Sequence, residues 1–228
     1  MEKSAGISLL IGAVLMLATI AFHPSGGNLE HLLRIARVNI ITHSMALLAL
    51  PFLGVGFWGL TRRMGIHHFL PLVSYAMMLT GLLAGMIAAT INGLALPIYI
   101  EHYKEASEEV VASLQPILRN NIALNQAFDF VFLGAVSVSI LFWSMSILTL
   151  KKLPLWIGYF GLVLSVTAIV MIASGYAFVN LHGFRLFIFF NVAWIVLMAV
   201  GLLRLKAGAQ SQEITDSKNE NTVQATGL

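Results

Sequence analysis

The chain has 228 residues, of which 58% are hydrophobic and 10% are charged, and its formal net charge at pH 7 is +3. Since a soluble domain carries about 25% charged residues, this composition excludes a water-soluble globular protein. The absence of cysteine excludes disulfides, thiolate metal sites and thiol nucleophiles.

Apolar runs of roughly 20 residues, the length that crosses a bilayer core of about 30 Å as a helix, follow one another along the chain. They predict an all-α fold, a polytopic membrane bundle of six transmembrane helices that forms one domain over residues 1–206. The predicted spans cover about 5–22, 39–60, 69–97, 121–150, 154–178 and 184–203. No Ala-x-Ala-type cleavage site follows the first run, so we expect a membrane helix there and not a cleaved signal peptide.

Two segments outside the spans have patterns of their own. Over residues 99–115 the apolar side chains fall mainly on one helical face and the charged side chains on the other. This pattern predicts an amphipathic helix on the membrane surface or across the mouth of the bundle, ended by Pro116. Residues 207–228 are polar and lack aromatic side chains, which predicts a disordered tail.

The distribution of Lys and Arg predicts the orientation. With a cytoplasmic N-terminus, eight of the 13 basic residues lie inside and five outside, and the inner loops include the pairs Arg62-Arg63 and Lys151-Lys152. We therefore expect both termini to be cytoplasmic. The general pattern resembles that of small bacterial six-helix membrane proteins, and this resemblance implies a place in a bacterial inner membrane but no particular activity.

A polar stripe marks the fourth span. Asn121, Asn125 and Asp129 recur every four residues, so they lie on one face of a helix in an otherwise apolar segment. A carboxylate at the edge of hydrocarbon is costly, and such groups usually face a bundle interior, a partner or water. The stripe is therefore the strongest indication of a functional site in the sequence.

Other polar residues fall at a matching depth. Counting about 20 residues outward from Lys3 reaches His23, and the same count from Arg62 reaches His43. The inner halves of the spans are almost purely apolar apart from Ser and Thr, so we expect a shallow pocket that opens to the outer side and is closed below. A histidine and an aspartate in this layer could also pair. The predicted ligand-binding residues are His43, Asn92, Asn125 and Asp129.

Two alternatives for this layer stay open. Polar side chains at a membrane boundary are ordinary, because they reach headgroups and water there. A metal site is the sharpest enzymatic interpretation, with His23, His43, His182 and Asp129 as candidate ligands, but the chain has no His-Glu-x-x-His spacing. Haem would need two axial ligands inside the bundle, and only His43 is well placed, so we expect no haem, and the sequence leaves the cofactor unknown.

The leading functional hypothesis is an integral membrane protein that binds a small or lipid-like ligand in the outer pocket, to transport or sense it. A second hypothesis is a membrane-embedded enzyme, for example a metal-dependent hydrolase acting on a lipid of the outer leaflet. A third is an accessory subunit that docks on a membrane protein partner through residues 99–115. The few scattered basic residues predict no contact with nucleic acid.

Overall fold

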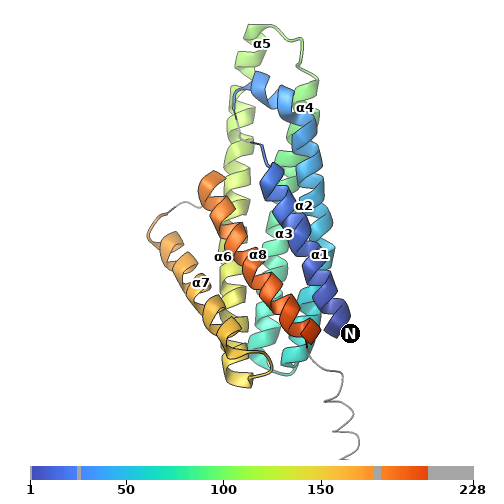
Figure 1. Ribbon diagram of the computed structural model, residues 1–228. Helices are drawn as coiled ribbons and strands as arrows, with labels where there is room; N and C mark the ends of the chain where they lie inside the picture. The colour runs from blue at the N-terminus through green and yellow to red at the C-terminus, as the bar shows by residue number, and fades with distance from the viewer. Residues whose placement is uncertain (1, 25–26, 177–180, 205–228) are drawn as a thin grey trace, which may run out of the picture.

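The protein is all-helical over the residues that its computed structural model describes, which are 2–24, 27–176 and 181–204. Six segments in this part of the chain are long and apolar enough to cross a membrane, so the predicted multi-pass membrane fold is confirmed. The elements in chain order are α1 (Glu2–Phe22), α2 (Leu29–Met64), α3 (Phe69–Thr90), the π-helical turn η1 (Ile91–Ala95), α4 (Leu96–Glu101), α5 (Glu108–Ser113), α6 (Gln115–Leu150), α7 (Leu155–Ala173) and α8 (Leu181–Arg204) (Figure 1). The predicted tail, 207–228, lies outside the described residues.

The start of α1 and the end of α8 lie at the same end of the bundle, which we call the inner end (Figure 1). There Arg63 Nη1 lies 3.1 Å from Glu2 Oε1, and Lys152 Nζ donates a hydrogen bond of 3.2 Å to the backbone oxygen of Met64. These contacts bring the two predicted dibasic loops and the N-terminal helix together. Of the basic residues assigned to the inner side from the sequence, those within the described ranges therefore share one end of the molecule.

Glycines allow close helix packing in the membrane-spanning part. A Cβ on Gly56 would lie 2.5 Å from Leu9 Cγ, and one on Gly81 would lie 2.8 Å from Val136 Cγ2. α1 therefore packs tightly along α2, and α3 along α6. Three aromatic side chains without solvent exposure stack through the centre of the bundle, with Trp143 between Phe57 and Trp194 at ring-centroid distances of 4.7 and 6.2 Å.

Several helices continue beyond α1 at the outer end. α2 and α6 have 36 residues each, or about 54 Å at 1.5 Å per residue, against 21 residues or about 32 Å for α1. Residues 29–40, 96–101 and 108–124 form a small helical assembly above the rest, which we call the outer extension (Figure 1). It has its own apolar core, formed by Leu29, Leu96, Ile100, Leu114 and Leu118.

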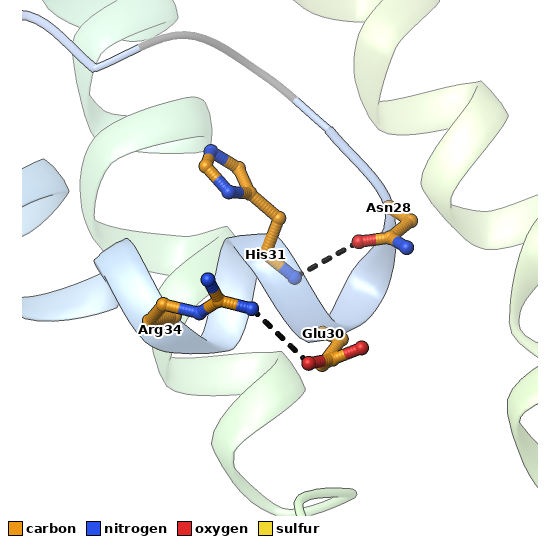
Figure 2. A network of polar contacts seen from close by, with 4 residues as sticks. All are labelled: Asn28, Glu30, His31 and Arg34. Carbon is orange, nitrogen blue, oxygen red and sulfur yellow. Dashed lines mark hydrogen bonds and ion pairs between the residues drawn. The ribbon is translucent and has the colours of Figure 1, made fainter.

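Local interactions fix the start of α2. The Asn28 side chain accepts a hydrogen bond of 3.0 Å from the His31 backbone N–H, and Arg34 Nη2 lies 3.1 Å from Glu30 Oε1 (Figure 2). A capping side chain typically contributes about 1 kcal/mol, and an exposed ion pair at this spacing contributes about 0.3–0.5 kcal/mol. The cap explains why α2 begins ten residues before the predicted span.

The structure corrects the bounds of two predicted elements. The continuous helix predicted over 99–115 is divided into the end of α4, a turn and the short helix α5, and Pro116 lies in the first turn of α6 instead of ending a helix. The buried apolar side chains of the segment 99–115 pack in the core of the outer extension. They are therefore not available to insert into the membrane surface. The span predicted over 154–178 ends at Ala173, because Gly175 with a φ of 82° turns the chain.

Candidate ligand-binding site

His43 lies on α2 at the base of the outer extension and is buried, with 6% of its surface exposed. Its Nδ1 lies 2.9 Å from the backbone oxygen of Asn39, one turn earlier on the same helix. The imidazole packs directly against Gly93 of η1, where a Cβ would overlap the Cβ and Cγ atoms of His43. A residue with any side chain at this point would push η1 away from α2.

The π-helical turn gives α2 a second contact with the same segment. The Asn39 side-chain Nδ2 donates a hydrogen bond of 2.9 Å to the backbone oxygen of Asn92. A π-turn shifts the backbone hydrogen-bond pattern, and single π-turns within α-helices often mark functional sites. Asn92, predicted as a site residue, is thus held to α2 through its backbone oxygen.

His23 follows the end of α1 and brings a second imidazole to His43. The ring centroids are 4.9 Å apart, with an angle of 60° between the rings. Arg185 of α8 donates a hydrogen bond of 2.9 Å from Nη2 to the backbone oxygen of His23. Burial lowers the pKa of the His23 imidazole below its usual 6.5; a backbone hydrogen bond to Pro24 raises this pKa in part, and the charge of Arg185 lowers it. His23 is therefore neutral at pH 7.

The predicted stripe of α6 is partly buried over its full length. Asn125 Nδ2 donates a hydrogen bond of 2.7 Å to Asp129 Oδ2, and Asn121 Nδ2 is buried with no hydrogen-bond partner in the part of the chain that the structure describes. One turn below Asp129, Phe132 contacts Phe184 of α8 at a ring-centroid distance of 6.1 Å. Toward the outer end of α6, the polar stripe therefore follows directly after the apolar contact between α6 and α8.

The turn η1 contacts both α2 and α6, the two helices that carry most of these residues. We use the name outer polar layer for the side chains at this level, which are His23, Asn39, His43, Asn92, Asn125, Asp129 and Arg185. His43 and Asp129 do not pair, since no hydrogen bond or ion pair joins them among the described residues and each bonds its own helix. Sequence reasoning missed Arg185 as a member of this layer, and its only signal was that it is the charged residue directly before the apolar run that begins at Leu186.

The metal candidates His23, His43, His182 and Asp129 are not grouped as ligands. Within residues 2–24, 27–176 and 181–204, no three His, Asp or Glu side chains are placed so that they could hold a metal ion. His23 and His43 touch, but His182 is exposed in the first turn of α8 and Asp129 bonds Asn125. The arrangement therefore offers two imidazoles, a carboxylate and amide groups without a preformed metal centre.

These groups suit the binding of a polar molecule. Neutral imidazoles and amides both donate and accept hydrogen bonds, and a partly buried carboxylate such as that of Asp129 recognises donors or a positive charge. The side chains come from α2, α6, α8, η1 and the residue that follows α1, so a ligand bound among them would also join these elements. No protein-family model matches the chain, no curated protein is similar to it, and no solved structure matches it.

Proposed function

We propose that this membrane protein binds a small polar or lipid-like ligand at its outer polar layer, with His43, Asn92, Asn125 and Asp129 as the binding residues. The observation that carries the proposal is the packing of the buried His43 against Gly93 and His23 at the π-helical turn. Burying polar groups at this level costs free energy. The buried Asn121 amide without a described partner adds a group that a ligand would satisfy.

The polar groups below this layer support a site that is closed toward the inner end. Ser74, Ser137 and Ser165 donate hydrogen bonds of 2.6–2.7 Å to backbone oxygens one turn earlier on their own helices. Ser8 and Ser139 instead donate to backbone oxygens of a neighbouring helix, at 2.8 and 2.6 Å. These five hydroxyl groups are bonded to backbone, and the described residues of the inner part have few other buried polar atoms, among them Ser144 Oγ and the indole nitrogens of Trp143 and Trp194. Transport would therefore need a rearrangement of helices, whereas sensing would not.

The orientation belongs to the same proposal. The inner end carries both dibasic pairs, and short loops rich in Lys and Arg usually remain in the cytoplasm. We therefore place both termini in the cytoplasm and the outer polar layer toward the outside of the cell, in a bacterial inner membrane. A ligand would then reach the layer from the outer leaflet or the external solution.

Mass spectrometry of the intact protein, purified from its own membranes in a mild detergent, tests this function. We expect a bound molecule of constant mass that is lost in His43→Gln and in Asp129→Asn. The control is His67→Gln, which removes an exposed imidazole at the inner end and should retain the molecule. Equal occupancy in all four proteins, or no bound molecule in any of them, would contradict the proposed site.

The outer extension favours a second candidate function, that of an accessory subunit. Its surface includes exposed apolar side chains beyond the polar layer, among them Ile98, Val110 and Ile117 at 60%, 40% and 47% exposure. A partner membrane protein that covers them should co-purify in a fixed ratio with the wild type and be lost in Ile98→Gln/Ile117→Gln. A monomeric wild type with no such partner would leave only the ligand-binding function.

A further inference from the structure

A groove opens at the inner end between the start of α3 and the end of α6. It has a volume of about 170 Å³ and is lined by His68, Phe69, Leu70, Pro71, Ser146, Thr149 and Leu150. Sites that enclose a drug-sized ligand measure roughly 300–1,000 Å³. The groove is therefore too small to enclose such a molecule, but it fits one part of a ligand whose remainder lies outside the protein.

The rim of the groove is basic. Lys152 Nζ and His68 Nε2 lie 3.6 and 3.4 Å from the position that a Cβ on Gly65 would occupy, so the ammonium group and the imidazole stand close together. Lys151 directly precedes Lys152 in the chain, is exposed and has no side-chain partner in the described ranges. It ends α6 in the left-handed conformation, with a φ of 53°.

Few acidic groups neutralise this end of the molecule. Among the described residues the inner end carries six basic side chains and one acidic side chain, which is Glu2. Glu2 is already paired with Arg63 at 3.1 Å, 61 residues away in the chain. The basic residues are Lys3, Arg62, Arg63, Lys151, Lys152 and Arg204. A ligand at the rim would therefore be anionic.

Apolar side chains form most of the walls of the groove. Phe69 is 75% exposed at its edge, and the hydroxyl groups of Ser146 and Thr149 donate to backbone oxygens of α6 at 2.8 and 2.9 Å. An anionic headgroup at a basic rim and apolar chains along the neighbouring helices together describe a phospholipid. Basic pockets between membrane helices are known to bind anionic lipid headgroups.

We propose that this groove is a binding site for an anionic phospholipid, whose phosphate lies near Lys151, Lys152 and His68. The glycerol part of the lipid occupies the groove between α3 and α6, and its chains extend along the exposed surface of both helices. This site lies at the opposite end from the outer polar layer, so it does not depend on the function proposed there.

Competition between two lipids tests the site. The full-length protein in detergent is mixed with equal amounts of phosphatidylglycerol and phosphatidylcholine, and the retained lipids are counted by mass spectrometry of the intact protein. We expect the wild type to retain phosphatidylglycerol at least about tenfold better. Lys151→Asn/Lys152→Gln should reduce this retention by about 30-fold, because each lysine near an anionic lipid contributes roughly fivefold. Asparagine is chosen because it tolerates the left-handed backbone at position 151.

Two further variants separate the groove from general surface charge. Arg34→Ala/Arg37→Ala removes the same number of charges from the outer extension and should leave retention unchanged. Leu70→Trp fills the groove, keeps all charges and should reduce retention about as much as the lysine variant. Lys151→Asn alone serves as the test if the double variant loses its helical circular dichroism.

Three results would overturn the proposal. The first is equal retention of the two lipids by the wild type. The second is an unchanged preference in Leu70→Trp, which would mean that surface charge alone attracts the lipid. The third is displacement of phosphatidylglycerol by millimolar inorganic phosphate, which would mean that the site takes a soluble anion.

Discussion

Replacing Gly93 by alanine tests the contact on which the candidate site depends. The new Cβ would overlap the Cβ and Cγ atoms of His43, which belong to the rigid base of that side chain, so η1 and α2 must move apart. Overpacking of this kind typically costs about 1–3 kcal/mol. Alanine gains about 1 kcal/mol over glycine in a helix. We therefore expect a net loss of up to about 2 kcal/mol of stability, together with weaker ligand binding.

Gly134→Ala is the matched control, because a Cβ on Gly134 of α6 would meet no atom within 4 Å. It should be neutral or stabilising by up to about 1 kcal/mol. The assay is reversible unfolding in mixed micelles, followed by circular dichroism. A difference of roughly 2 kcal/mol between the two variants corresponds to about 30-fold in the unfolding equilibrium. Equal stabilities would refute the close approach of η1 to α2.

Three other predictions concern the titration of His23, the charge of Asp129 and the C-terminal tail. Because the pKa of His23 is lowered in the folded protein, the unfolded chain binds more protons near pH 6, and stability should fall as the pH drops below about 6.5. Melting temperatures measured across this pH range should show a smaller decrease in His23→Gln than in the wild type. Asp129→Asn should melt like the wild type and Asp129→Leu at the same or a higher temperature, while both lose the bound molecule; if both retain it, Asp129 is an interfacial residue only. Deletion of 208–228, which removes no aromatic residue, should leave the yield and melting temperature unchanged, and a large loss of extractable protein would show that the tail docks on the bundle.

The membrane-spanning part of the fold could be predicted because long apolar runs have few other structures open to them in a bilayer. The depth of the polar residues was predicted by counting about 20 residues outward from the inner basic residues. This count placed His23 and His43 at the same depth, and the contact between their rings agrees with it. Of the outer extension only the helical segment over 99–115 was predicted, and the continuation of α2 and α6 beyond the membrane-spanning part was not, since these stretches are only partly apolar. Its local signals were present in the Asn28 cap and the Glu30–Arg34 pair, but a search for apolar runs does not detect them.

The details of the candidate site depend on contacts between distant parts of the chain. Arg185 bonds the backbone of His23 across 162 residues, and no local pattern records this contact. The π-helical turn could not be predicted from the sequence either, because glycines such as Gly93 are also common in regular membrane helices. The sequence allowed a histidine to pair with Asp129, and for a related reason no such pair forms with His43 among the described residues. Equal depth along two helices does not fix the rotation of either helix, which decides where each side chain points.

The natural absence of cysteine allows one direct measurement of the central claim that the polar layer is reached from outside the cell. Single cysteines are placed at Ser107 in the outer turn, at Asn125 in the layer and at Lys151 at the inner end, and intact cells are treated with a membrane-impermeant maleimide. The proposed function predicts labelling at positions 107 and 125 and none at 151 until the cells are opened. Labelling at 151 with protection at 107 would place the polar layer on the cytoplasmic side and contradict the claim.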